Sequence, residues 1–121
     1  GLSPDGSSSY YLPRLVGVRR ATELMLTNRT LRAAEAADWG LINEVVPAAE
    51  LEARAQALAE QLASAAKGSS GAVKKLLLAS FGNTIEAQMD LESELIGACA
   101  DSADGREGID AFLNKRAPNF G

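Results

Sequence analysis

The clearest candidate for chemistry is Asp5, in the sequence Pro4-Asp5-Gly6. We expect a helix to begin just after it, and the backbone N–H groups and dipole at a helix N-terminus favour a negative charge. An ionised carboxylate in that setting could act as a base or as a nucleophile. Pro-Asp-Gly is also an ordinary turn sequence. The residues alone therefore leave two interpretations open, a structural turn or cap and a functional acid.

Other groups that could do chemistry are few. The chain has no histidine and one cysteine, Cys99, which excludes a Ser-His-Asp triad, an ordinary zinc site and an intramolecular disulfide. Ser7, Ser8 and Ser9 thus have no histidine base to activate them, and we expect them to cap a helix. Cys99 lies on the apolar side of its predicted helix, so we expect a small, buried side chain. No metal site is predicted.

Three pairs of adjacent basic residues could bind a phosphate: Arg19-Arg20, Lys74-Lys75 and Lys115-Arg116. Guanidinium and ammonium groups both recognise phosphate oxygens. Such pairs also occur simply as solvated helix faces, and at Lys115 the two interpretations stay open.

The composition limits the class of protein. The 121 residues are 46% hydrophobic and 23% charged, with a net charge of −4, which is typical of one soluble globular domain. No apolar run approaches the roughly 18 residues of a membrane span, and no signal peptide is visible, so we expect a cytoplasmic protein. The acidic balance argues against a nucleic-acid partner. Because the chain begins without Met, we expect it to be part of something longer.

The elements that must position these groups are mostly helices. The chain is rich in Ala and Leu and has three Phe, one Trp and two Tyr, a mixture that favours helix over strand. Apolar spacing and capping patterns predict helices over residues 19–28, 31–39, 49–66, 71–80, 83–99 and 104–113, with residues 67–71 as a loop. Asn83 and Asp104 are the expected N-caps of the last two helices.

One segment does not follow the helical pattern. Residues 41–47 are rich in β-branched side chains and end at Pro47, which predicts a short strand. A lone strand cannot satisfy its backbone hydrogen-bonding groups, so we expect its partner to lie outside these residues or in another subunit. The predicted fold class is mainly α, a helical array with one short strand.

Several sequence motifs occur in the order found in one known family. They are Pro4-Asp5-Gly6 with residues 12–17, the run Arg20 to Thr27, Ala33 to Ala36 followed by residues 39–43 and 45–47, Glu107-Gly108-Ile109 with Ala111-Phe112, and the end Lys115-Arg116-Ala117-Pro118-Asn119-Phe120. With these motifs the chain resembles the crotonase (enoyl-CoA hydratase/isomerase) superfamily along essentially its whole length.

The resemblance implies an organisation and an assembly. Family subunits are about twice as long, so this chain would be the C-terminal half of a crotonase/ClpP-like α/β fold. Residues 1–47 would end the crotonase core, and residues 48–121 would form the helical trimerisation region. A complete protein would then be a homo-oligomer, a trimer or a dimer of trimers. The oxyanion hole and the two glutamates of family hydratases would lie upstream of Gly1, so we expect the 121 residues alone to be inactive.

The resemblance also assigns roles to two residues. Asp5 matches the catalytic aspartate of dienoyl-CoA and ring-epoxide phenylacetyl-CoA isomerases, which use it as a base, and of 4-chlorobenzoyl-CoA dehalogenase, which uses it as a nucleophile. Lys115 matches a lysine that reaches the phosphates of coenzyme A. We therefore expect an acyl-CoA substrate, no covalently bound cofactor and a proton-shuttling isomerisation. A dehalogenase-like hydrolase and a helical oligomerisation or binding module without its own catalysis are the alternatives.

Overall fold

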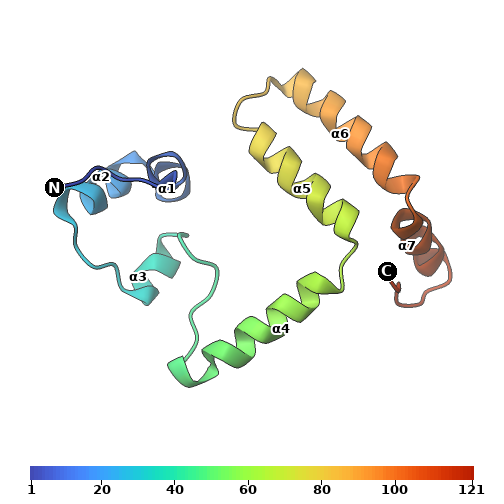
Figure 1. Cartoon of the computed structure of the whole chain (residues 1–121), viewed down its shortest axis with the longest axis horizontal. Helices are drawn as coiled ribbons and strands as arrows, with labels where there is room; N and C mark the ends of the chain where they lie inside the picture. Colours follow the sequence, from blue (N-terminus) through green and yellow to red (C-terminus); the bar gives the residue numbers. More distant parts are fainter. The chain divides into compact units, whose positions relative to one another are not determined.

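The computed structural model describes all residues from 1 to 121 and confirms a mainly helical chain (Figure 1). Its elements are α1 (Ser8–Val16), α2 (Val18–Thr27), α3 (Ala33–Asp38), a short 3-10 helix η1 (Ala48–Glu50), α4 (Leu51–Ala63), α5 (Lys67–Ala79), α6 (Ile85–Ala100) and α7 (Ala103–Leu113). The chain divides into two compact units, Gly1–Glu52 and Ala53–Gly121. The boundary predicted from the sequence, after residue 47, lies a few residues before the boundary between these two units.

In the first unit, α1 and α2 pack against each other around a sharp corner. Gly17 joins them with a φ of 82°, a backbone conformation that residues with a side chain rarely adopt. Val16 and Ala21, on either side of this corner, are 8% and 3% exposed. The small side chain of Ala21 lets the two helices approach closely. Ala36 of α3 is the third buried residue of this unit.

The strand predicted over residues 41–47 is not formed. The segment after α3 turns at Gly40, bends, and continues without regular structure to Pro47. A β-strand needs a second strand for its backbone hydrogen bonds, and nothing in these 121 residues supplies one. The fold-class prediction is therefore confirmed for its helices and wrong for its one strand within the chain as described.

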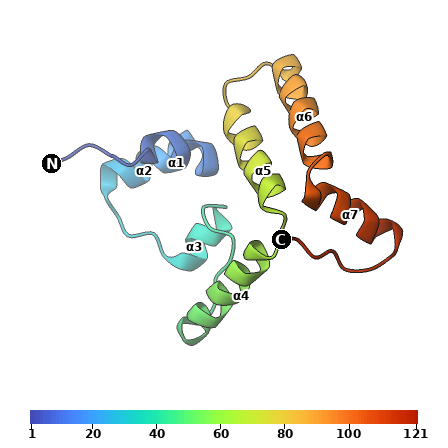
Figure 2. The ribbon, with the colours of Figure 1, turned by 45° about the vertical axis from the view of Figure 1, so that its right-hand side comes forward.

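In the second unit, α5 and α6 lie side by side as an antiparallel pair (Figures 1 and 2). α7 then turns away from α6 through Asp101 and Ser102. At this corner a Cβ atom on Gly105 would collide with the backbone oxygen of Cys99, so glycine permits the close approach. Ala111 of α7 is 1% exposed.

One element boundary predicted for this unit is wrong. Residues 67–71, expected to be a loop, form the first turns of α5. Gly and Ser are weak helix formers, yet the helix begins at Lys67, and the backbone N of Ser70 donates to Ala66 O at 3.0 Å in its first turn.

The N-caps also differ from those predicted. Thr84, next to Asn83, accepts from Ala87 N at 3.3 Å, and Ser102 rather than Asp104 accepts from Gly105 N at 2.9 Å.

Candidate functional site

Asp5 lies in a tight turn that precedes α1. Its backbone oxygen accepts two hydrogen bonds from Ser8, one from the backbone N at 3.0 Å and one from Oγ at 2.7 Å. Gly6 and Ser7 both have a left-handed conformation, with φ of 57° and 63°. Ser7 is the N-cap of α1 but makes no capping bond with its side chain, so the predicted serine caps are not formed. The turn is held by the carbonyl of Asp5 and not by its carboxylate.

The carboxylate of Asp5 is left unpaired. The side chain is exposed, and no group of the chain hydrogen-bonds to it or forms an ion pair with it. A hollow of about 340 Å³ lies at the same turn, between the N-terminal segment, α1 and α2. Its lining includes Pro4 and Ser8 on either side of Asp5 in the sequence, and the apolar side chains Leu12, Leu24 and Met25. The turn thus has a free carboxylate, and residues before and after Asp5 line the hollow, although Asp5 itself does not.

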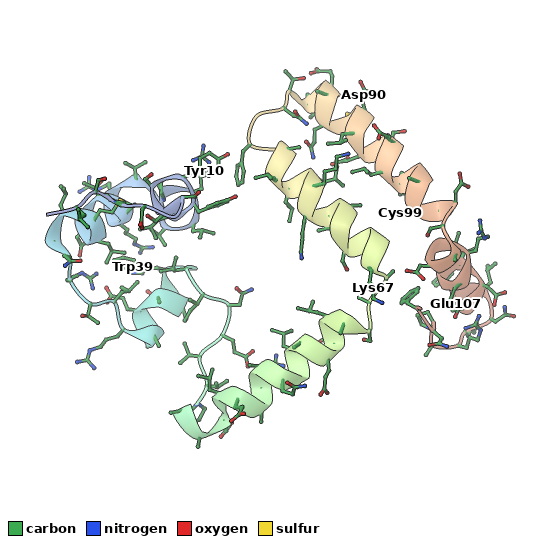
Figure 3. All side chains as sticks on the ribbon, in the orientation of Figure 1. Tyr10, Trp39, Lys67, Asp90, Cys99 and Glu107 are labelled. Atoms are coloured by element: carbon green, nitrogen blue, oxygen red, sulfur yellow. The ribbon has the colours of Figure 1, made fainter.

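A cluster around Arg29 ties α2 to α3 in the same unit. The guanidinium of Arg29 donates to Glu35 through Nη1 at 3.0 Å and Nη2 at 2.7 Å, and to Glu23 through Nε at 2.6 Å. These bonds raise the pKa of Arg29, and the bond from Arg29 lowers the pKa of Glu35. Trp39, labelled in Figure 3, lies beneath two cations, with its ring centre 4.6 Å from Cζ of Arg20 and 5.1 Å from that of Arg29. The first unit is therefore fixed by polar contacts as well as by its small core.

Lys115 lies where the chain reverses after α7. Its N–H donates to Phe112 O at 3.2 Å, and the N–H of Arg116 donates to Ala111 O at 3.0 Å. This pair of bonds is the Schellman motif that ends many helices. Lys115 occupies the left-handed position of the motif, with a φ of 52°, where glycine is usual. Its side chain is exposed and forms no ion pair within the chain.

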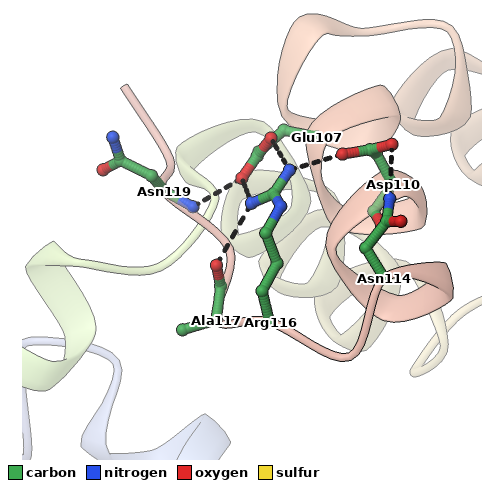
Figure 4. Close-up of polar contacts among 6 residues, drawn as sticks. All are labelled: Glu107, Asp110, Asn114, Arg116, Ala117 and Asn119. Carbon is green, nitrogen blue, oxygen red and sulfur yellow. Dashed lines mark hydrogen bonds and ion pairs between the residues drawn. The ribbon is translucent and has the colours of Figure 1, made fainter.

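The residue after Lys115 ties the C-terminal segment back onto α7 (Figure 4). Nη1 and Nη2 of Arg116 donate to the two carboxylate oxygens of Glu107 at 2.6 and 2.8 Å, and Nη2 also donates to Asp110 at 2.6 Å. The N–H of Asn119 donates to Glu107 at 2.8 Å. Arg116 first, and then Asn119, lower the pKa of Glu107 to about 2. We call Glu107, Asp110, Arg116 and Asn119 the C-terminal clasp.

The second unit also has two apolar grooves. One, of about 530 Å³, lies between α6, α7 and Phe120, and the other, of about 500 Å³, lies between α5 and α6. Cys99 of α6, labelled in Figure 3, contributes to both. It is partly exposed and not buried as expected. Ile96 and Phe112 are 71% and 83% exposed, so the unit presents apolar surface that its own helices do not cover.

The two predicted site residues belong to different units, Asp5 to the first and Lys115 to the second. The turn at Asp5 and the basic pair at Lys115 are visible in the sequence, but the clasp and the Arg29 cluster are not predicted by it. Their one sequence signal is the presence of arginine within ten residues of two acidic residues. No group of His, Cys, Asp or Glu could hold a metal ion, and none of the helices has the length and apolar character of a membrane span.

Comparisons with a family model and with named proteins agree with each other. The chain matches the family model described as Enoyl-CoA hydratase/isomerase over residues 1–121. It is 43% identical over 120 residues to a protein named probable enoyl-CoA hydratase from Rhodobacter capsulatus, covering 99% of this chain and 47% of that protein. It is 40% identical over 120 residues to 1,2-epoxyphenylacetyl-CoA isomerase of Escherichia coli, covering 99% and 46%. A 4-chlorobenzoyl coenzyme A dehalogenase of Arthrobacter is 39% identical over 115 residues, covering 95% and 42%.

The fold agrees with these matches. The crystal structure of an enoyl-CoA hydratase from Polaromonas superimposes with a TM-score of 0.93 at 33% identity, covering 100% of this chain and 47% of that one. The chain thus spans slightly less than half the length of the relatives it matches. Because the family model matches residues 1–121 and the fold is shared, the chain belongs to the enoyl-CoA hydratase/isomerase family.

Proposed function

We propose that this chain supplies the Asp5-bearing part of an enzyme that isomerises acyl-CoA thioesters, with Asp5 as the proton shuttle. The observation that carries the proposal is the free carboxylate of Asp5, in a turn whose residues Pro4 and Ser8 line a partly apolar hollow. A carboxylate held only through its backbone can accept a proton from one carbon of a substrate and return it to another. Such a base needs no metal and no covalently bound cofactor.

The relatives support this choice of chemistry. The isomerase of Escherichia coli is named for a coenzyme A thioester, as is the dehalogenase of Arthrobacter. In the family that the chain resembles, backbone N–H groups upstream of this region stabilise the charge that develops on the thioester oxygen. Losing such donors costs about a hundredfold or more in rate. We therefore propose that the 121 residues have no activity alone and that the natural-length protein is the enzyme.

The test replaces Asp5 in the natural-length protein. Asp5→Asn keeps the size of the side chain and the turn at its carbonyl but removes the base, and we expect double-bond isomerisation of a panel of enoyl-CoA thioesters to slow by about 10²- to 10⁴-fold. Asp38→Asn is the matched control, because Asp38 is an exposed aspartate of the same unit away from the Asp5 turn. An Asp5→Asn protein that isomerises the whole panel at the parental rate rules out the proposal.

A second candidate function uses the same residue differently. The match to the Arthrobacter dehalogenase covers nearly the whole chain, and a free carboxylate can also attack an aromatic carbon. The carboxylate would form an ester with the ring as chloride leaves, and water would then hydrolyse the ester. Chloride release from 4-chlorobenzoyl-CoA, lost in Asp5→Asn, identifies this activity, whereas double-bond movement without chloride release identifies isomerisation.

The helices of the second unit suggest a structural role that accompanies either reaction. Apolar side chains such as Ile96 and Phe112 are mostly exposed, and surfaces of this kind are typical of subunit contacts. We propose that this unit forms contacts in a homo-oligomer. Light scattering should give a mass above that of the monomer. A stable monomer that does not bind a dye specific for exposed apolar surface contradicts the proposal.

A further inference from the structure

A single residue, Ser8, makes every hydrogen bond that holds Asp5 in its turn. The carbonyl oxygen of Asp5 accepts from the backbone N of Ser8 at 3.0 Å and from Ser8 Oγ at 2.7 Å. A carbonyl oxygen has two lone pairs, so the same residue fills both acceptor positions. Asp5 makes no other hydrogen bond within the chain. The position of Asp5 therefore depends on Ser8.

The central residues of this turn do not maintain its geometry by themselves. Gly6 and Ser7 have φ of 57° and 63°, and positive φ at both central positions is characteristic of a type I′ turn. Glycine adopts positive and negative φ with similar ease, so Gly6 does not select this conformation. Ser7 has a Cβ atom, for which a left-handed backbone is unfavourable. The bonds from Ser8 to Asp5 are therefore needed to keep the turn closed.

The three consecutive serines after Gly6 differ in their contacts. Ser7 is the N-cap of α1, but its side chain makes no capping bond. Ser9 is exposed, and its side chain forms no hydrogen bond within the chain. The hydroxyl of Ser8 alone donates to Asp5. The run therefore contains one hydroxyl that restrains Asp5, next to a similar residue that provides a matched control.

Ser8 also connects the turn to the hollow at this end of the unit. Ser8 and Leu12, which lies one helical turn later in α1, both line the hollow of about 340 Å³. The bond from Ser8 Oγ thus ties the backbone of Asp5 to a residue of the wall. A general base has to come within hydrogen-bond distance of the proton that it removes, and a misplacement of about 1 Å can slow a reaction about a hundredfold. A restraint on the backbone of Asp5 therefore bears on its rate as a base.

We propose that Ser8 is a positioning residue for Asp5, whose hydroxyl restrains the Asp5–Gly6 peptide group and so presents the carboxylate to the substrate in one position. Ser8 acts through Asp5 and does not itself transfer the proton. Because the bond goes to the carbonyl oxygen of Asp5, it fixes the backbone while the carboxylate stays available. This inference rests on the proposed function, since it takes Asp5 as the proton shuttle.

The first experiment measures the isomerisation of an enoyl-CoA by variants of the natural-length protein. Ser8→Ala removes the Oγ bond and keeps the backbone bond, and we expect kcat to fall about fivefold with KM unchanged, as for the loss of one neutral hydrogen bond. Ser8→Thr keeps a hydroxyl and should recover most of the parental kcat. Ser9→Ala is the matched control and should leave both constants unchanged.

The second experiment separates positioning from a general loss of structure. In an Asp5→Asn protein, Ser8→Ala should not slow the residual reaction further, because no base is left to position. The order parameter of the Gly6 amide, which shares its peptide group with the carbonyl of Asp5, should fall in Ser8→Ala and recover in Ser8→Thr. Both readouts distinguish a restraint on Asp5 from a change in overall stability.

The outcomes that overturn this inference differ from those that overturn the proposed function. A parental kcat or a parental Gly6 order parameter in Ser8→Ala overturns the positioning role and leaves Asp5 as the proposed base. An equal loss of rate from Ser8→Ala with and without Asp5→Asn shows a merely structural serine and also overturns it. Parental isomerisation by Asp5→Asn alone instead overturns the proposed function, and with it the purpose given to Ser8.

Discussion

The turn at Asp5 and the turn at Lys115 both present a charged, exposed side chain at a helix end, but different contacts fix their backbones. Each lies at a helix end, before α1 in one case and after α7 in the other. Each contains a residue other than glycine with a left-handed backbone, Ser7 and Lys115. In both turns the charged side chain is exposed and has no partner within the chain.

The difference lies in what holds the backbone. At the first turn, one serine side chain and one backbone N–H bond to the carbonyl of Asp5, so the restraint is local and nearly neutral. At the second turn, the restraint is an ion-pair network that joins residues nine positions apart. A free carboxylate would be neutralised by a nearby cation, whereas a free ammonium has to be protected from nearby acids. A charged side chain therefore stays free either where the restraint carries no charge, as at Asp5, or where the charges of the restraint are paired with one another, as at Lys115.

The largest effect is expected where α7, the helix that precedes Lys115, leaves α6. A Cβ on Gly105 would collide with the backbone of Cys99 and Ala100, so Gly105→Ala should lower the free energy of unfolding by about 1–3 kcal/mol. Gly97→Ala is the control, because Gly97 lies inside α6 with nothing within 4 Å of an added Cβ, and it should gain about 0.5–1 kcal/mol. Urea denaturation measures both. A Gly105→Ala protein as stable as the parent contradicts the close approach.

The next effect concerns the cap of the same helix. The Oγ of Ser102 accepts from Gly105 N at 2.9 Å and donates to Cys99 O at 2.6 Å. Ser102→Ala removes both bonds and should cost about 1 kcal/mol. Thr84→Ala, at the start of α6, removes a longer bond of 3.3 Å and should cost less. Equal losses of stability for the two variants in thermal denaturation would contradict the expectation that the shorter bond makes the stronger cap.

A smaller effect, of opposite sign, is expected at the two left-handed residues. Ser7→Gly and Lys115→Gly relieve an unfavourable backbone conformation, and each should raise the free energy of unfolding by about 0.5 kcal/mol after the larger chain entropy of glycine is included. Lys74→Gly, inside α5, should instead lose about 1 kcal/mol. A loss of stability at position 115 would indicate that lysine is retained for the fold.

The smallest effect is expected from acid, because the clasp is exposed. The pKa of Glu107 is lowered from 4.5 to about 2, so the ionised carboxylate favours the folded state above pH 4.5, and this contribution is lost as the pH falls through 2. The amide resonance of Asn119, which reports the clasp, should keep its position from pH 7 to pH 4 and change near pH 2. In Glu107→Gln it should show no transition in that range. A parental midpoint near pH 4.5 would contradict the bond from Arg116.

Much of the helical structure could be predicted because it follows from local periodicity. The repeat of apolar residues is enough to predict α4 and α6. Residues 67–71 were mispredicted because their glycines and serines favour a loop, and the sequence has no capping signal that places the start of α5 at Lys67. Residues 41–47 have the composition of a strand, but composition cannot provide the partner that a strand needs. At the cap of α6, Asn83 and Thr84 are both good caps, and sequence cannot choose between neighbours.

The candidate site was predicted less completely than the fold. Asp5 is recognisable by its type and its place before a helix, and Lys115 by its place in a basic pair. The left-handed backbone of Lys115 depends on two hydrogen bonds at the end of α7, and the clasp depends on the chain folding back upon that helix. Neither has a local sequence pattern. Once the end of α7 is known, the sequence does offer one signal. It has a lysine at the position where a Schellman motif favours glycine.

The central claim, that Asp5 moves a proton on an acyl-CoA thioester, is tested most directly by hydrogen exchange. The natural-length protein is incubated with an enoyl-CoA in deuterated water, and the deuterium content of the acyl group is followed by mass spectrometry. The parent and Asp38→Asn should incorporate deuterium at the same rate, and Asp5→Asn should do so at least about a hundredfold more slowly. Incorporation by Asp5→Asn at the parental rate would contradict the claim.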